Sequence, residues 1–296
     1  MFKDIEKLNV GEVYFDVDLS KYTTYKINSV GAVLVIPSDI NCLIKLISYI
    51  KDNNYKYKVL GNGSNLVFVN SFYDGILIKL DHFNELDIDA NVVTVGAGYN
   101  LMKLALKTSM MGLSGLEFAT GIPGSIGGSI YMNAGAYNSD ISSVLVSCKV
   151  LTPNLDIVVF NKSDFDFSYR MSFFQKNPGY VCLEAKFKLS FGDKKEIMEL
   201  VNSRRERRFS SQPLEYPSAG SVFRNPEGDF AGRMIEELGF KGKSIGGAQV
   251  SPKHANFIVN VGGATGRDVK SLVNEIKNEV KKNYGVELKV EQEFVE

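Results

Sequence analysis

Two glycine-rich loops, at residues 61–66 and 121–128, limit the folds open to this 296-residue chain. Each loop adjoins a short run of residues that predicts a strand. Glycine allows the backbone to approach another group closely, and successive backbone amides can point at one anion. One such loop is weak evidence for a site. Two of them together predict a dinucleotide clasped by loops rather than by a helix dipole.

Neither loop matches a standard nucleotide-binding pattern. The first begins like a Rossmann fingerprint, but Leu66 replaces the third glycine, and a strand is predicted where that fold has a helix. Taken alone, this loop is equally consistent with a hairpin turn. Gly242-Lys243-Ser244 resembles the end of a P-loop, but Glu237 occupies the position of a required glycine. The sequence therefore argues against a Rossmann domain and against a P-loop triphosphatase.

Strand and helix patterns alternate around both loops. Runs of β-branched residues predict strands, and spaced apolar residues behind a cap predict helices. The strands are expected at residues 32–36, 58–60, 66–69, 75–80, 91–96, 143–151, 157–160 and 180–189. One helix is expected after the cap Ser38-Asp39, another at residues 100–111, and a third from Asp193 to about Phe209. The glycines of residues 112–137 indicate backbone that lies against another strand or a ligand.

A domain boundary is predicted near residue 208. Residues 210–219 contain Pro213 and Pro217 and are typical of a linker. Beyond it we expect helices at residues 230–238 and 268–284 and strands at 254–260 and 286–294. The expected domains are residues 1–208, with subdomains of about 1–57 and 58–208, and residues 209–296. Four arginines before the boundary indicate a solvated helix face, with phosphate steering as the alternative: Arg204, Arg205, Arg207 and Arg208.

Charge and composition exclude several classes of protein. Basic and acidic residues each total 34, so no net charge attracts nucleic acid or an anionic membrane. No apolar stretch approaches the length of a membrane span, and the N-terminus is too charged for a signal peptide. Cys42, Cys148 and Cys182 are unclustered, which fits a reducing compartment better than disulfides or zinc. We therefore expect a cytoplasmic monomer with no nucleic-acid or membrane partner.

The remaining catalytic candidates are few. His82 and His254 are too far apart in the sequence to suggest a metal site, so no metal is expected. No Gly-x-Ser-x-Gly elbow accompanies His254, which argues against a Ser-His-Asp hydrolase. Residues 217–226 place Ser221 near Arg224 and Asn225. A hydroxyl beside a cation and an amide suits proton transfer to a substrate, and a polar turn is the alternative.

These motifs, in this order, resemble the UDP-N-acetylenolpyruvoylglucosamine reductase family over residues 20–291. The matching segments are residues 61–66, 121–128, 132–137, 169–170, 219–226, 246–248 and 254–257. The resemblance implies an α+β protein with a p-cresol-methylhydroxylase-like FAD-binding fold of two subdomains and a smaller C-terminal α+β substrate domain. The short interval between Arg170 and Ser221 is similar to the family's subgroup without an extra tyrosine-bearing loop.

The resemblance also implies roles for individual residues. Ser221 would donate a proton, while Arg170 and Glu291 would polarise the substrate; Arg170 could instead be a structural ion-pair partner. The residues implied to bind FAD are Gly61, Asn62, Gly63, Ser64, Asn65, Leu66, Gly121, Ile122, Pro123, Gly124, Ser125, Gly127 and Gly128. The residues implied to bind the substrate are Tyr137, Tyr169, Arg224, Asn225, His254 and Asn256.

The chain departs from the family pattern at two places. Glu291 is followed by Gln292 and Glu293, where the family has a β-branched residue and a basic one. Strand alternation would put Glu291 and Glu293 on the same face, so Glu293 is the alternative catalytic carboxylate. In the linker, residues 210–212 replace a lysine that many relatives carry, and a nearby arginine could serve instead.

The implied function is reduction of UDP-N-acetylglucosamine enolpyruvate to UDP-N-acetylmuramate, a step in peptidoglycan precursor synthesis. The resemblance implies FAD as a non-covalent cofactor and NADPH as the hydride donor. Two alternatives stay open: an FAD-linked oxidase of a small alcohol or sugar, and a nucleotide-sugar binding module without enzymatic activity. Tightly bound FAD, with NADPH oxidation that depends on the enolpyruvyl sugar, would separate the three.

Overall fold

The computed structural model describes residues 2–296, with only the backbone described for Lys3. Contacts group the chain into two compact units. The first unit consists of residues up to Phe15, Val33–Asn62 and Gly75–Glu206, and the second of Asp16–Ala32, Gly63–Asp74 and Arg207–Glu296. The first unit ends at Glu206 and the second resumes at Arg207, within α5 (Lys194–Ser211). The sequence placed a domain boundary near residue 208.

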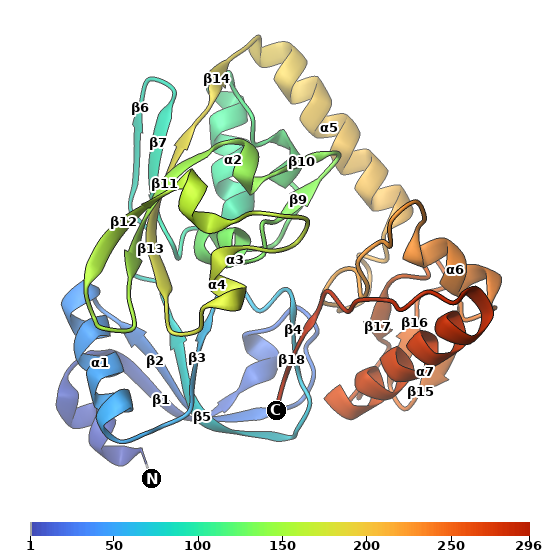
Figure 1. The fold of residues 1–296 in the computed structure, drawn as a ribbon, viewed down its shortest axis with the longest axis horizontal. Helices are drawn as coiled ribbons and strands as arrows, with labels where there is room; N and C mark the ends of the chain where they lie inside the picture. The colour runs from blue at the N-terminus through green and yellow to red at the C-terminus, as the bar shows by residue number, and fades with distance from the viewer. Residues whose placement is uncertain (1) are drawn as a thin grey trace. The chain divides into compact units, whose positions relative to one another are not determined.

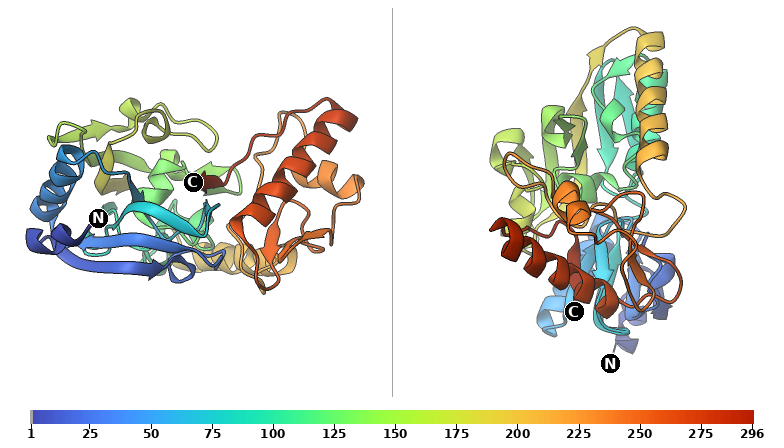
Figure 2. Two further views of the ribbon diagram at one scale, coloured as in Figure 1. Left: turned by 90° about the horizontal axis from the view of Figure 1, so that it is seen from below. Right: turned by 90° about the vertical axis from the view of Figure 1, so that its right-hand side faces the viewer.

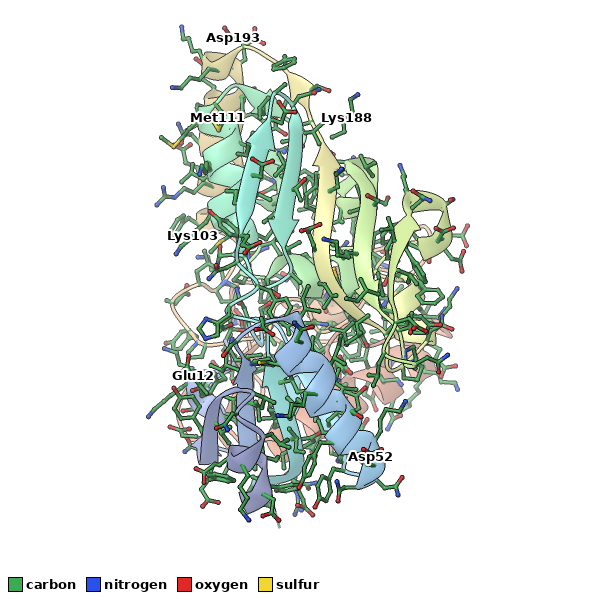
Figure 3. The ribbon with its side chains drawn as sticks, turned by 90° about the vertical axis from the view of Figure 1, so that its left-hand side faces the viewer. Glu12, Asp52, Lys103, Met111, Lys188 and Asp193 are labelled. Atoms are coloured by element: carbon green, nitrogen blue, oxygen red, sulfur yellow. The ribbon has the colours of Figure 1, made fainter. Side chains whose placement is uncertain are left out.

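The first unit contains a five-stranded antiparallel sheet (Figure 1). Its strands, in spatial order, are β12 (Ile157–Asn161), β11 (Leu145–Leu151), β13 (Val181–Lys188), β7 (Val92–Gly96) and β6 (Leu86–Asp89). Helix α3 (Ile126–Tyr131) packs against β13 and β7. Helix α2 (Leu101–Met110) begins at the cap Asn100, and Figure 3 marks it by Lys103 and Met111. The sheet and these helices hold the second glycine-rich loop.

A second sheet has the order β1 (Gly11–Asp18), β2 (Val30–Pro37), β5 (Phe72–Lys79), β3 (Tyr57–Leu60). Strands β3 and β5 are parallel. The division into units falls within β1, β2 and β5. Helix α1 (Ile40–Asp52) follows β2, and the Asp39 carboxylate accepts a hydrogen bond from the Cys42 amide at 2.8 Å. The predicted cap is therefore confirmed.

The second unit packs α7 (Gly266–Tyr284) across a small antiparallel sheet (Figures 1 and 2). That sheet has the order β15 (Ser244–Ile245), β16 (Ala248–Val250), β17 (Ile258–Asn260). Tyr25 is fully buried in the same core, and its hydroxyl donates to the Ile258 carbonyl at 2.7 Å. Helix α6 (Ala231–Glu237) contacts α7, and β18 (Glu293–Val295) pairs in parallel with β4 (Leu66–Phe68).

Short elements complete the chain. The remaining strands are β8 (Leu113–Ser114), β9 (Gly135–Ala136), β10 (Ser139–Asp140) and β14 (Ser190–Phe191). The remaining helices are η1 (Lys3–Leu8), η2 (Leu19–Lys21), η3 (Glu117–Ala119), η4 (Ile141–Ser143), η5 (Lys162–Phe165) and α4 (Phe173–Lys176). Among residues 2–296, no helix combines the length and the apolar character needed to cross a membrane.

Three expectations for the C-terminal third are corrected. The strand expected at 254–260 is reduced to β17, because the Phe257 amide bonds back to the His254 carbonyl and forms a turn. The strand expected at 286–294 is reduced to β18, since the preceding residues make only an isolated bridge between Phe223 and Val290. Helix α5 runs to Ser211, into the expected linker, because the Ser211 hydroxyl bonds to the Arg207 carbonyl at 2.7 Å.

Candidate active site

Gly61, the first residue of the first glycine-rich loop, lies against the second loop within the first unit. A Cβ atom built on Gly61 would lie 2.6 Å from the Ser125 hydroxyl oxygen, and one built on Gly128 would lie 4.0 Å from the Gly61 Cα. A side chain at Gly61 would therefore displace the Ser125 hydroxyl. The hairpin alternative for the first loop is wrong, because β3 and β4, the strands on either side of it, belong to different sheets.

The second loop is fastened to the chain around the start of α2. The Gly127 amide donates to the Ala97 carbonyl at 2.8 Å, and the Leu101 amide donates to the Gly124 carbonyl at 2.9 Å. The Ser125 hydroxyl then caps α3 by accepting from the Gly128 amide at 3.3 Å. A short helix therefore starts inside this loop, where the sequence predicted loop structure alone. Gly121, Ile122 and Pro123 precede it and are half-buried.

The chain after α3 holds the Tyr169-Arg170 segment. The Asn133 side-chain amide donates to the Ser168 carbonyl at 3.0 Å, and the Gln175 side-chain amide donates to the Arg170 carbonyl at 3.1 Å. The Arg170 guanidinium donates to the Gly135 carbonyl at 2.6 Å. Arg170 has a φ of 57°, a left-handed conformation that needs such support. The motif at 132–137 therefore positions Arg170.

Two tyrosines of the predicted substrate site lie in this unit. Tyr169 is exposed, and the Arg170 guanidinium carbon lies 5.1 Å from its ring centre. The Tyr137 hydroxyl donates to the Arg204 carbonyl at 3.0 Å, and the Arg204 guanidinium carbon lies 5.0 Å from the Tyr137 ring centre. One of the four arginines on α5 thus contacts a predicted substrate residue.

Lys79 was missed by the sequence analysis. It ends the apolar strand β5 with only 8% exposure, and its ammonium group donates to the Gly61 carbonyl at 3.4 Å. It also pairs with Asp81 at 3.0 Å. The available signal was a lysine at the end of the apolar run Ile76-Leu77-Ile78, in the strand that pairs with the one before the glycine-rich loop. This buried cation lies where an anion held by the loops would be stabilised.

The second half of the first loop belongs to the second unit. Gly63 has a φ of +62°, and a Cβ atom there would lie 2.1 Å from the Tyr22 carbonyl oxygen. The Asn65 side-chain amide donates to the Glu291 carbonyl at 3.0 Å, and the Asn65 carbonyl accepts from the Glu293 amide at 2.8 Å. The loop therefore fixes the backbone on both sides of Gln292. Asn62 and Ser64 are half-buried, and Leu66 starts β4.

Ser221 lies on a backbone segment anchored from two directions. It forms an isolated antiparallel bridge with Phe257, and the next amide, that of Val222, donates to the Asn256 carbonyl at 2.9 Å. The Asn256 side chain donates to the Phe223 carbonyl at 2.8 Å and accepts from the Phe223 amide at 2.9 Å. From the other side, the Glu291 amide donates to the Val222 carbonyl at 2.8 Å. Ser221, Asn256 and Glu291 thus belong to one hydrogen-bonded assembly.

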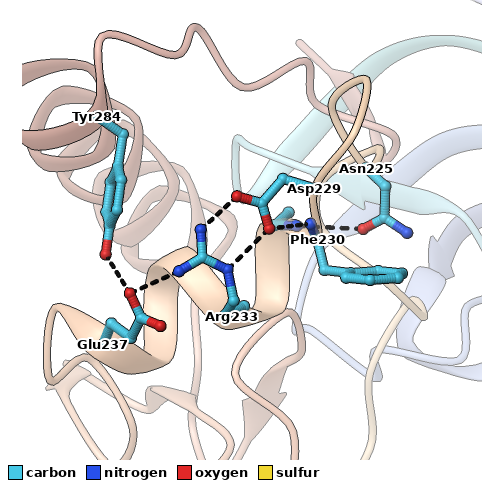
Figure 4. A network of polar contacts seen from close by, with 7 residues as sticks. Asn225, Asp229, Phe230, Arg233, Glu237 and Tyr284 are labelled. Atoms are coloured by element: carbon cyan, nitrogen blue, oxygen red, sulfur yellow. Dashed lines mark hydrogen bonds and ion pairs between the residues drawn. The ribbon is translucent and has the colours of Figure 1, made fainter.

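Arg224 presents a buried nitrogen that can bind an anion. Its Nε atom is buried and has no hydrogen-bond partner among the described residues. A buried guanidinium nitrogen without a partner is costly, and an anionic group on a substrate would satisfy it. The neighbouring Asn225 accepts a hydrogen bond from the Ala231 amide at 3.2 Å and so fixes the start of α6 (Figure 4).

His254 is held in the neutral form. Its Nδ1 atom accepts a hydrogen bond from the Asn256 amide at 3.2 Å, so Nδ1 carries no proton in this arrangement. Burial lowers the pKa of His254 below its usual value, because desolvation disfavours the charged ring. Gly232 of α6 packs beside it: a Cβ atom there would lie 3.5 Å from the His254 Cε1 atom. His254 therefore supports the turn that carries Asn256.

The two loops fit a bound diphosphate. Neither residues 61–66 nor residues 121–128 include an acidic side chain. Glycines bring the loops together, and the Lys79 ammonium lies beside the first one. Within residues 2–296, no group of three or more His, Cys, Asp or Glu side chains is placed to hold a metal ion. The site is therefore suited to an organic cofactor with an anionic linker.

Comparisons with known proteins assign that cofactor. A family model described as an FAD binding domain matches residues 31–161, which include both glycine-rich loops. The fold and the loops together define an FAD-binding protein. A second model, described as the C-terminal domain of UDP-N-acetylenolpyruvoylglucosamine reductase, matches residues 212–295.

Relatives of that name match the whole chain. The protein from Halalkalibacterium halodurans is 42% identical over 296 residues, which cover 100% of this chain and 98% of the relative. The Bacillus subtilis protein is 41% identical with the same coverage. The crystal structure of the Thermus caldophilus reductase is 31% identical, has a TM-score of 0.81, and matches 96% of this chain and 98% of that one. The chain belongs to the UDP-N-acetylenolpyruvoylglucosamine reductase family.

These findings confirm the fold class expected from the sequence. The chain has the p-cresol-methylhydroxylase-like FAD-binding fold followed by a C-terminal α+β domain. Its cofactor is FAD. The loops at 61–66 and 121–128, which predicted a dinucleotide, both lie within the residues that the FAD-binding model matches.

Proposed function

We propose that this chain reduces the enolpyruvyl ether of UDP-N-acetylglucosamine enolpyruvate to UDP-N-acetylmuramate, with NADPH as the reductant. The observation that carries the proposal is the identity of 42% over the full length to a relative named UDP-N-acetylenolpyruvoylglucosamine reductase. The Ser221 assembly supports it, because the hydroxyl of Ser221, the Arg224 guanidinium with its buried Nε and the Glu291 carboxylate belong to one unit.

The protein's residues would bind and orient both reactants. Residues 1–208 would bind FAD and residues 209–296 the UDP-sugar. The loop residues Gly61–Leu66 and Gly121–Gly128 would hold the FAD diphosphate, with Lys79 adding positive charge. FAD, when bound, would supply the hydride-transfer chemistry between NADPH and the enolpyruvyl group.

Three side chains would stabilise charge and donate the proton. Arg170 would bind the enolpyruvyl carboxylate, and Glu291, as a protonated or hydrogen-bonding carboxyl group, would assist as negative charge builds on that side. Ser221 would then give its proton to the carbon beside the carboxylate. One hydride and one proton add across the carbon–carbon double bond, so the product is the saturated lactyl ether.

The proposed substrate residues have different tasks. Arg224, with its unpartnered Nε, would contact an anionic part of the substrate, and Tyr137, Tyr169 and Asn225 have exposed side chains that can reach one. Asn256 and His254 would act mainly by holding the Ser221 segment, since the Asn256 amide is bonded to Phe223. We further propose that the chain works in the cytoplasm as a monomer, without nucleic-acid or membrane partners; its balanced charge supports this.

Stopped-flow kinetics on the FAD-loaded protein test the proposal. Anaerobic NADPH should bleach the flavin, and the enolpyruvyl sugar should then restore its colour. Ser221→Ala should leave the bleaching step nearly unchanged and slow the recovery by ~10²–10⁴-fold, the usual loss for a positioned general acid. Ser221→Cys should regain part of the rate. Recovery with oxygen but not with the enolpyruvyl sugar would indicate an oxidase, and absence of bleaching would indicate a binding module; either result overturns the proposal.

A further inference from the structure

Gln292 is a buried polar side chain beside the proposed catalytic residue Glu291. It is only 4% exposed. Its side-chain Nε2 donates to the Gly220 carbonyl at 3.1 Å, while its Oε1 is buried without a hydrogen-bond partner among the described residues. Burying an amide that is only half satisfied is less favourable than burying a branched apolar group. This glutamine is therefore unexplained by packing alone.

The bond to Gly220 acts on the peptide group that directly precedes Ser221. Gly220 has a φ of +74°, a left-handed conformation that favours glycine. The Gly220 carbonyl that accepts this bond therefore belongs to the peptide that leads into Ser221. The amide of Gln292 is the side-chain contact that fixes the Gly220 carbonyl, 72 positions away in the sequence.

The same contact completes the anchoring of Ser221. On the C-terminal side, the amide and carbonyl of Val222 are bonded to Asn256 and to Glu291 respectively. On the N-terminal side, the Gly220 carbonyl is bonded to Gln292. Fixing the peptide groups on both sides of Ser221 fixes the direction of its Cα–Cβ bond. Gln292 also adjoins Glu291, so two neighbouring residues carry the carboxylate and the hydrogen bond to Gly220.

We propose that Gln292 is a positioning residue for Ser221: its side-chain amide holds the Gly220–Ser221 peptide so that the hydroxyl points at the substrate carbon. The inference rests on the proposed function, in which Ser221 donates the proton. A residue with this task affects the proton-transfer step and leaves the NADPH step alone. A residue that only filled the core would affect both steps or neither.

The test compares Gln292→Met, which has a similar length but no hydrogen-bonding groups, with Gln249→Met. Gln249 is the matched control, because its side chain also donates to a glycine carbonyl, that of Gly242, at 3.1 Å. In the FAD-loaded protein, Gln292→Met should slow flavin recovery by the enolpyruvyl sugar about 3- to 10-fold, the value of one hydrogen bond, and leave flavin bleaching by NADPH unchanged. Its solvent deuterium isotope effect on recovery should rise. Gln249→Met should change neither.

A double variant makes the assignment specific. If Gln292 acts through Ser221, adding Gln292→Met to Ser221→Ala should cause no further loss. Full additivity, or equal slowing of bleaching and recovery, would overturn the positioning role. Should Gln292→Met retain no FAD, Gln292→Glu, which keeps the shape and loses the donor, takes its place with the same expectations. The proposed function itself is tested by the wild-type protein: flavin that bleaches with NADPH but never recovers with the enolpyruvyl sugar would overturn it. Normal recovery in Gln292→Met would instead overturn only the positioning role.

Discussion

At the scale of single residues, the structure sharpens the choice between two carboxylates. Gln292 is buried, whereas its neighbours Glu291 and Glu293 are half-buried. Of the three, only Glu293 belongs to strand β18. Their backbone bonds differ: the Glu291 amide joins the Ser221 segment through Val222, and the Glu293 amide joins Asn65.

That difference favours Glu291 as the catalytic carboxylate. Glu291→Gln should slow flavin recovery by the enolpyruvyl sugar roughly 10²–10³-fold, the loss typical of one group that stabilises charge in the transition state. Glu293→Gln should have a mild effect, since its backbone is tied to the loop at Asn65 and not to the Ser221 segment. Single-turnover recovery rates measure both. The reverse ranking would transfer the role to Glu293, and equal small losses would exclude both.

At the scale of elements, a polar network joins α6 to α7 (Figure 4). The Arg233 guanidinium donates to Asp229 at 2.8 Å and to Glu237 at 2.7 Å, and the Tyr284 hydroxyl donates to Glu237 at 2.8 Å. The hydrogen bond from Arg233 lowers the pKa of Asp229 from 3.8 to about 2. Because Asn225 bonds to the first residue of α6, this network steadies the helix that follows the substrate motif.

The lowered pKa sets the pH dependence of that network. A carboxylate with a depressed pKa in the folded state stabilises the protein above its ordinary value of 3.8, and this contribution is lost as the pH falls through about 2. Arg233→Met should therefore lower Tm at pH 7, and the Tm difference from the wild type should shrink between pH 4 and pH 2. The control is Arg267→Met, whose guanidinium donates to the Asn70 amide oxygen. A difference that stays constant down to pH 2 would contradict the ionic origin.

At the scale of the whole molecule, FAD should act as a stabilising ligand. A ligand that binds only the folded chain at 100 times its Kd stabilises it by about 2.7 kcal/mol, so Tm should rise with FAD concentration. Gly61→Ala should reduce this shift, because the new Cβ would lie 2.6 Å from the Ser125 hydroxyl and displace it from the Gly128 amide that it caps. Gly232→Ala, with its nearest contact at 3.5 Å, should keep it. An unchanged Tm on adding FAD, or a full shift in Gly61→Ala, would refute the loop assignment.

Local signals in the sequence were enough for most elements and for the class of cofactor. The cap Asp39 and the periodic apolar residues behind it predicted α1, because capping and helical packing are decided within a few residues of chain. A helix was likewise expected over residues 100–111, where α2 lies. The paired glycine-rich loops predicted a dinucleotide site for the same reason, because each loop is recognised from a few consecutive residues. The order of motifs then placed the chain in its family.

Contacts between distant parts of the chain were decided only by the tertiary structure. That Gly61 faces Ser125, that Lys79 reaches the first loop, and that Gln292 holds Gly220 all depend on strand register and packing rather than on local pattern. The same holds for the shortened strands at residues 254–260 and 286–294, where tertiary hydrogen bonds replaced a regular ladder. A sequence pattern records which groups a residue can bond, whereas the fold selects the partner, since only packing brings residues 72 positions apart into contact.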